Sequence, residues 1–280
     1  MNAITSFIDA SNVYGSDADR AERLRKRGSP RGLLDFSYDG RKSGQKIMLP
    51  FNQGGPDVVE MDCRRMRERE IPASARVACY RAGDARANEQ IGLTTMHTVF
   101  LRAHNRIGTA LHSLNGGLSG DEIYYTTRKI IGAIMQKVTY NEWLPAVLGD
   151  SGMKLLGKYE GYKPDVNPAI ANVFATSAFR FGHSLITPYV RRLEENGDKL
   201  ARYGHALLHE SFFNPYKLAY EGGVDPIIRG LVLTPAKDRR SEKSKQFHPS
   251  LIEKLFKASG TYFRFLFFWR SIQELENQST

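Results

Sequence analysis

The chain has 280 residues and is 41% hydrophobic, enough for a packed core in one large domain or two small ones. Its formal net charge of +10 reflects basic runs at 20–27, 64–69 and 237–245. No zinc-finger spacing or aromatic nucleic-acid motif accompanies these runs, so solvated surface is favoured over a specific nucleic-acid partner. No apolar run approaches the roughly 20 residues of a membrane span. The first ten residues do not have the pattern of a signal peptide.

An oxygen-rich stretch lies near the start of the chain and contains Thr5, Asp9 and Ser11. Such side chains, together with loop carbonyls, can coordinate a hard cation such as calcium. Their spacing does not match the twelve-residue calcium loop of helix–loop–helix proteins. From these residues alone, an ordinary polar turn is therefore the favoured alternative.

Residues 16–26 predict a short surface helix with Ser16 as its cap. Residues 28–62 are rich in Gly, Pro and Asp and predict ordered loop with one short hairpin. The two cysteines, Cys63 and Cys79, are too few for a disulfide scaffold. Their number is equally compatible with a disulfide and with two free thiols.

A polar run at 80–92 precedes a long helix predicted at Leu93–Leu114. The run contains Asp84, Arg86, Glu89 and Gln90. The apolar stripe of the helix is Leu93, Met96, Phe100, Ala103, Ile107 and Leu111. A helix N-terminus stabilises carboxylates and can bind anions, although capping and surface charge explain the same residues. His97 and His104 lie two turns apart, too far to chelate one metal, and are predicted to be structural.

Ser119 and Glu122 make a capping box that begins a second long helix, predicted to continue to Leu148. Residues 220–236 mix turn signals with a short apolar helix, and 247–256 predict one more amphipathic helix. Few segments alternate as strands do. The sequence therefore predicts a mainly α fold with long loops in a single domain.

The segment 167–188 predicts a buried helix capped by Asn167, because it is apolar on most sides. Arg180 and His183 lie one turn apart on one face of this helix. This pair suits a flat, anionic, iron-containing ligand, with the histidine on the metal and the arginine at a carboxylate. Gly182 would leave room for the plane of the ligand. A buried His and Arg satisfied by backbone carbonyls and a protein carboxylate is the alternative, favoured from this segment alone.

Four stretches together resemble one family, the animal haem peroxidases. They are TSFIDASNVYGS (5–16), AGDARANEQIGLTTMHTVFLRAHNRI (82–107), NVFATSAFRFGHSLI (172–186) and EGGVDPIIRGL (221–231). Their order and spacing agree with the family over about residues 4–256. The resemblance implies a haem-peroxidase-like helical domain over 1–256, truncated at both ends, and a divergent tail at 257–280.

The resemblance implies a role for each residue that aligns with a functional position of the family. His183 matches the proximal haem-iron ligand, and Arg180 matches the arginine that meets a haem propionate. Arg86 matches the distal catalytic arginine. Glu89 matches the glutamate that forms an ester with a haem methyl, so a b-type haem attached through this residue is implied. Gln90 stands where some members carry a methionine bonded to a haem vinyl group, so no sulfonium link is expected.

The same resemblance implies a calcium site and a disulfide. The residues that match the family's calcium loop are Thr5, Phe7 (through its carbonyl), Asp9 and Ser11. Cys63 and Cys79 match an internal disulfide of the family. A disulfide argues for an oxidising compartment, and hence for an extracellular or secretory location.

The implied function is oxidation of halides or phenolic substrates with hydrogen peroxide, in response to oxidative stress. The family's distal histidine, an aspartate ester and a further calcium ligand lie upstream of the calcium loop, and this sequence does not contain them. The RDHG-containing stretch, with the asparagine partner of the proximal histidine, is also not found. We therefore expect weakened calcium binding, weak haem binding and little turnover. A non-enzymatic binding or extracellular matrix protein is the alternative.

Overall fold

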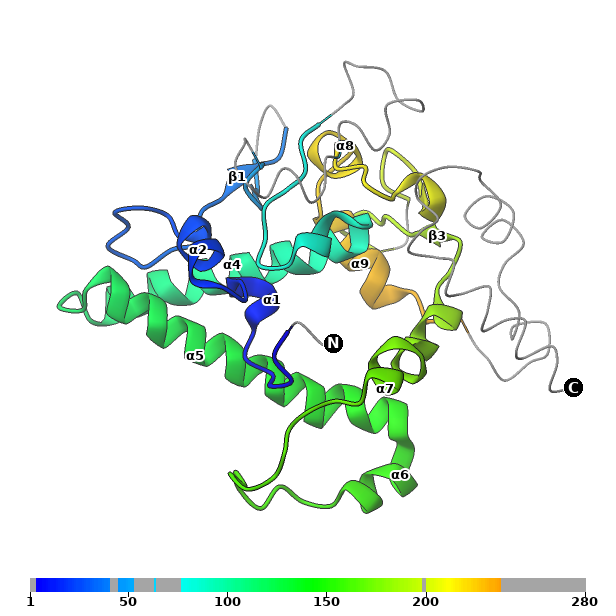
Figure 1. Cartoon of the computed structure of the whole chain (residues 1–280). Coiled ribbons are helices and arrows are strands. Elements are labelled where there is room, and N and C mark those ends of the chain that lie inside the picture. Colours follow the sequence, from blue (N-terminus) through cyan, green and yellow to red (C-terminus); the bar gives the residue numbers. More distant parts are fainter. Residues whose placement is uncertain (1–3, 41–44, 53–62, 64–76, 198–199, 238–280) are drawn as a thin grey trace, which may run out of the picture.

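The computed structural model describes residues 4–40, 45–52, 63, 77–197 and 200–237 and is mainly α-helical, as predicted (Figure 1). The α-helices are α1 (Ser11–Tyr14), α2 (Ala18–Leu24), α4 (Ile91–Leu114), α5 (Gly120–Val138), α6 (Leu144–Leu156), α7 (Asn172–Thr176), α8 (Tyr216–Ala219) and α9 (Asp225–Leu233). The 3-10 helices are η3 (Ala85–Asn88), η5 (Ala178–Leu185) and η6 (Leu208–Glu210), and η4 (Thr139–Trp143) is a π-helix. Two antiparallel strand pairs are β1 (Ser37–Tyr38) with β2 (Ile47–Met48), and β3 (Tyr189–Val190) with β4 (Ala206–Leu207).

The N-terminal predictions hold with one change of cap. Helix α2 is the surface helix predicted for 16–26, but Asp17 rather than Ser16 caps it, since the Asp17 carboxylate accepts from the Arg20 amide at 2.7 Å. The β1–β2 pair is the hairpin predicted within 28–62. Local turn chemistry was therefore read correctly to within a residue or two.

Helix α4 confirms the long helix predicted at Leu93–Leu114 and begins two residues earlier, at Ile91. The Gln90 side chain explains the earlier start, because its Oε1 accepts from the Gly92 amide at 2.6 Å and caps the first turn. Figure 1 shows α4 and α5 diverging from the loop that joins them. Together they form the frame on which the rest of the described chain packs.

The predicted apolar stripe of α4 is partly buried, since Phe100, Ala103 and Ile107 pack against the core. Met96 of that stripe is 44% exposed. The buried residues are largely polar or small: Ile91, Thr94, Thr95, His97, Thr98, Leu101, His104, Asn105 and Gly108. The hydroxyls of Thr95 and Thr98 donate to the carbonyls of Ile91 and Thr94 at 2.7 and 2.8 Å. Because these hydroxyls are satisfied within the helix, they can be buried against neighbouring elements.

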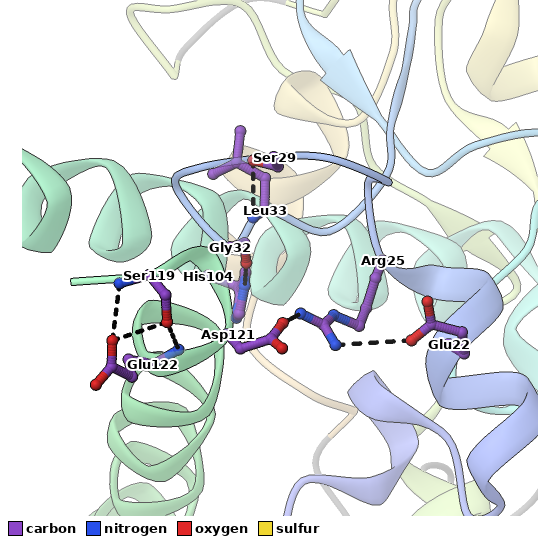
Figure 2. A network of polar contacts seen from close by, with 9 residues as sticks. All are labelled: Glu22, Arg25, Ser29, Gly32, Leu33, His104, Ser119, Asp121 and Glu122. Atoms are coloured by element: carbon purple, nitrogen blue, oxygen red, sulfur yellow. Dashed lines mark hydrogen bonds and ion pairs between the residues drawn. The ribbon is translucent and has the colours of Figure 1, made fainter.

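Helix α5 begins with the predicted capping box, in which the Glu122 amide donates to Ser119 Oγ at 3.2 Å and the Ser119 amide donates to Glu122 Oε2 at 2.8 Å. Figure 2 shows this box beside an ion pair between Arg25 and Asp121, which ties the end of α2 to the first turn of α5. The helix predicted to Leu148 is confirmed, because the backbone stays helical through α5, η4 and the start of α6, with a π-helical turn at Thr139–Trp143. The kink lies at Gly149 inside α6, where φ is +64° and ψ is −180°.

His104 links three elements in the core, in agreement with the structural role predicted for it. Its Nε2 donates to the Gly32 carbonyl at 2.9 Å, so its Nδ1 accepts from the Tyr14 hydroxyl at 2.7 Å (Figure 2 draws the first of these bonds). The Tyr14 ring also meets Tyr124 of α5 edge-on. Gly32 has a φ of +57°, and a Cβ there would lie 2.4 Å from the carbonyl oxygen of Gly120. Only glycine allows this approach.

Arg192 holds the β3–β4 region to the loop before α9. Its side chain is 2% exposed, and its guanidinium donates to the carbonyls of Tyr203 and Gly204 at 2.7 and 2.6 Å. It also donates to Glu221 Oε2 at 2.8 Å. The buried charge is therefore matched by a carboxylate and two carbonyls, the condition under which such a burial is tolerated.

The prediction of one buried helix at 167–188 is wrong. The segment forms α7 and then η5, and Ser177 between them has φ −126° and ψ −76°, outside the helical region. Asn167 caps only a local turn, accepting from the Ala169 amide at 3.0 Å. The phenylalanines of the segment are partly exposed, at 47% for Phe174, 52% for Phe179 and 38% for Phe181. Because the break redirects the chain, the apolar residues of this segment do not form one buried surface.

Other predictions fall outside the described residues. These are the helix at 247–256, the division between 1–256 and 257–280, the basic run at 64–69 and nearly all of that at 237–245. In the part of the chain that is described, no helix is both long and apolar enough to cross a membrane.

Candidate functional site

An open cavity of about 570 Å³ lies beside the N-terminal end of α4. The first turn of α4, the chain from His183 to Arg191, and the last turns of α9 form its walls, and these elements lie close together in Figure 1. Most of the wall is apolar, made by Leu93, Met96, Leu185, Ile186, Val190, Leu208, Phe212 and Leu231. A largely apolar cavity with a few ionisable groups is typical of a cofactor or ligand site.

Glu89 lies in the wall of this cavity, directly after η3. Burial raises the pKa of its carboxyl, while the positive charges of Arg86 and Arg180 act in the opposite direction. The fold therefore brings two arginines from distant parts of the sequence within electrostatic reach of one carboxylate. The roles predicted for Arg86, Glu89 and Arg180 at a haem site stay predictions.

His183 lines the same cavity, but it is an exposed residue of a 3-10 helix rather than the buried α-helical residue predicted. Partial burial of its ring lowers its pKa, and the nearby charge of Arg180 lowers it further. A hydrogen bond with the Arg180 backbone acts in the opposite direction. The neutral imidazole, which is the metal-binding form, is therefore favoured at neutral pH. Gly182 faces open space, since a Cβ there would meet nothing within 4 Å, so no protein contact requires glycine.

Arg86 lies in η3, and the Asp84 carboxylate holds its guanidinium. Arg86 Nε donates to Asp84 Oδ1 at 3.0 Å, and Nη2 donates to Oδ2 at 2.7 Å. Burial alone would raise the pKa of the Asp84 carboxyl, but the hydrogen bonds from Arg86 outweigh it and the pKa is lowered. The same bonds raise the pKa of Arg86, so the arginine carries a fixed positive charge. The sequence placed Asp84 in a polar run without assigning it a role.

A second wall of the cavity, beside Glu89, is the loop that contains Phe212 and Phe213, and the sequence did not predict it. The Phe213 amide donates to the Glu89 carbonyl at 3.2 Å, and Phe212 forms a bridge with Gln90. Phe213 has a φ of +47°, an uncommon value for a residue other than glycine. This strained turn places Phe212 in the cavity wall. Its only sequence signal is a pair of adjacent phenylalanines, which does not indicate a partner so distant in the chain.

Three of the four predicted calcium ligands lie in the loop that leads into α1, and Ser11 is the first residue of that helix. Asp9 Oδ1 accepts from the Ser11 amide at 2.8 Å, and Thr5 Oγ1 accepts from the Phe7 amide at 3.2 Å. Asp9 is the only carboxylate among the four. Across the described ranges, no group of three or more His, Cys, Asp or Glu side chains is placed to hold a metal ion.

Cys63 and Cys79 form a disulfide with Cα atoms 5.1 Å apart, as the family resemblance implied. The bond lies next to Tyr80, whose amide and carbonyl both pair with the Asn88 side chain at 2.7 Å. Asn88 belongs to η3, so the disulfide is close to the backbone that carries Arg86.

Comparison with known proteins relates the chain, over most of its length, to haem peroxidases. A family model of the animal haem peroxidases matches residues 1–266. The chain is 45% identical to Peroxidasin of Drosophila melanogaster and 47% identical to the Peroxidasin homolog of Homo sapiens, each over 261 residues. These matches cover 92% and 93% of this chain but only 16% and 17% of the two relatives. Among solved structures, Peroxidase A from Dictyostelium discoideum superposes with a TM-score of 0.67 at 30% identity, covering 84% of this chain and 41% of that one.

Proposed function

Because the chain belongs to the animal haem peroxidase family, we propose that it binds haem and uses hydrogen peroxide to oxidise halides or phenolic substrates. One observation carries this proposal. Glu89 and His183, which are remote in the sequence, line one largely apolar cavity, and Arg86 and Arg180 lie within electrostatic reach of Glu89. We propose a response to oxidative stress as the context of this activity.

The residues of the cavity fit a haem group. The apolar wall suits a porphyrin plane, and the neutral imidazole of His183 suits an iron atom. In this proposal Glu89 would form an ester with the ring, and Arg180 would pair with a propionate. The Gln90 side chain caps α4, and we propose no bond between it and the haem. When bound, haem supplies the redox chemistry, while the protein binds and orients it.

Arg86 has the role of a fixed positive charge beside the cavity. Its guanidinium stays protonated at any relevant pH, and Asp84 holds it in one orientation. A donor of this kind stabilises negative charge that develops on an oxygen of peroxide.

Three further parts of the proposal concern metal, location and partners. We propose a calcium site with few charged ligands at Thr5, Phe7, Asp9 and Ser11. Its oxygen donors are of the type that calcium prefers. The disulfide supports an extracellular or secretory location, where hydrogen peroxide and extracellular matrix proteins would be the partners.

Haem loading of the 280-residue chain tests the proposal. We expect a Soret band on reconstitution, its loss in His183→Gly and its recovery when imidazole is added. His112→Gly, in the last turn of α4 at the far end from the cavity, is the matched control and should keep the band. An unchanged band in His183→Gly would refute His183 as the ligand. Haem binding without turnover of peroxide and bromide would favour the alternative, a non-enzymatic binding protein.

A further inference from the structure

Asp84 is the partner of Arg86 through both its backbone and its side chain. One carboxylate oxygen accepts from the Arg86 amide at 2.8 Å and from Nε at 3.0 Å, and the other accepts from Nη2 at 2.7 Å. We propose that Asp84 is a positioning residue that holds the guanidinium of Arg86 beside the haem cavity. We call this set of hydrogen bonds between Asp84 and Arg86 the clamp. The part of Arg86 in peroxide chemistry rests on the proposed function, but the clamp itself does not.

The exposure of the two side chains shows why a clamp matters. The Arg86 side chain is 62% exposed, so its surroundings restrain it little, whereas the Asp84 side chain is 18% exposed. The two parallel N–H···O bonds fix the plane of the guanidinium as well as its position. The same carboxylate also caps η3, because it accepts a hydrogen bond from the backbone amide of Arg86. The Asp84 carboxylate therefore binds both the main chain and the side chain of Arg86.

Asp84 is itself fixed from two sides. A Cβ on Gly83 would lie 2.5 Å from the carbonyl carbon of Val13 and 2.6 Å from the Asn12 oxygen, so the backbone there packs directly on α1. On the α4 side, the side chain of His97 is buried, and Asp84 is near enough for its charge to act against the lowering of the His97 pKa by burial. The clamp therefore connects the arginine to α1 and α4, two parts of the packed core.

If Asp84 only capped η3, its replacement by asparagine would leave the side chain of Arg86 unaffected, whereas a clamp predicts a change. Asparagine is as good an N-cap as aspartate, because its side-chain oxygen can accept from the same backbone amide. It cannot make the charged, two-pronged contact with a guanidinium. Asp84→Asn should therefore keep η3 and release the side chain of Arg86.

Arginine-specific modification of the full chain without haem measures that release. Chymotryptic peptides are analysed by mass spectrometry after brief treatment with phenylglyoxal, which attacks the deprotonated guanidine. Asp84→Asn is expected to speed modification of Arg86 by about two- to fivefold, the range for a partly exposed ion pair. Asp35→Asn is the matched control, because Asp35 pairs with Arg81 at 3.0 Å. It should speed modification of Arg81 and leave Arg86 unchanged.

An unchanged rate at Arg86 in Asp84→Asn, with the expected response of Arg81 in the control, would overturn the clamp and leave only a cap. Asp84→Ser, which also keeps a capping oxygen, repeats the test if the asparagine variant does not fold. In haem-loaded protein, fluoride should bind Asp84→Asn about two- to fivefold more weakly, since the anion loses an ordered donor. Equal fluoride affinity would refute the positioning role even if the clamp exists. Failure of the wild-type chain to bind haem would refute the proposed function and leave the modification result intact.

Discussion

His104 is expected to make the fold sensitive to acid. Burial lowers its pKa from the usual 6.5 to about 4, with the charge of Arg25 acting in the same direction and the bond to the Gly32 carbonyl opposing it. The unfolded chain takes up a proton at this residue near pH 6.5, whereas the folded chain does so only near pH 4. The contribution of His104 to the free energy of unfolding is therefore fully present above pH 6.5 and is lost as the pH falls toward 4.

The size of this loss follows from the two pKa values. Each unit of difference corresponds to about 1.4 kcal/mol, so the free energy of unfolding should fall by about 3 kcal/mol between pH 7 and pH 4. His104→Gln removes the titration but keeps one donor and one acceptor, for Gly32 and Tyr14. The assay is urea unfolding followed by circular dichroism at a series of pH values.

The informative quantity is the difference between wild type and His104→Gln at each pH. Burial also lowers the pKa of His97 and His183, but these groups are common to both proteins and cancel. We expect the two stability curves to converge as the pH falls. Curves that stay parallel between pH 7 and pH 4 would refute the assignment of this acid sensitivity to His104.

Three further predictions concern stability and the cavity wall. Arg192→Met should lower the free energy of unfolding by about 3–5 kcal/mol in urea titrations, because it leaves a carboxylate and two carbonyls without their donor. Gly230→Ala should cost about 1–3 kcal/mol by calorimetry, because its Cβ would lie 1.9 Å from the Arg191 carbonyl oxygen, whereas Gly182→Ala should be neutral. Cys63→Ser should cost about 3 kcal/mol, and equal stability of this variant and the oxidised wild type would contradict a stabilising disulfide.

Much of the fold could be predicted from the sequence, because it depends on local interactions. The capping box of Ser119 and Glu122, and the long helix after Gln90, depend on side chains that bond backbone groups two or three residues away. The family motifs also indicated which residues would gather at one site, although they are remote in the chain. Glu89 and His183 line one cavity, and the charges of Arg86 and Arg180 act on Glu89, but the roles assigned to these residues stay predictions.

The tertiary structure alone decided which surfaces are covered and which partners each side chain takes. Apolar spacing correctly predicted that Phe100, Ala103 and Ile107 of α4 pack against the core, but it did not predict that hydrogen-bonded threonines are buried more fully. It also predicted a buried helix where the break at Ser177 leaves two short exposed ones. The contact of Phe213 with Glu89 and the choice of Asp84 by Arg86 depend on where other segments lie. Hydrogen bonds within a turn are encoded in adjacent residues, whereas burial and long-range pairing are properties of the whole packed chain.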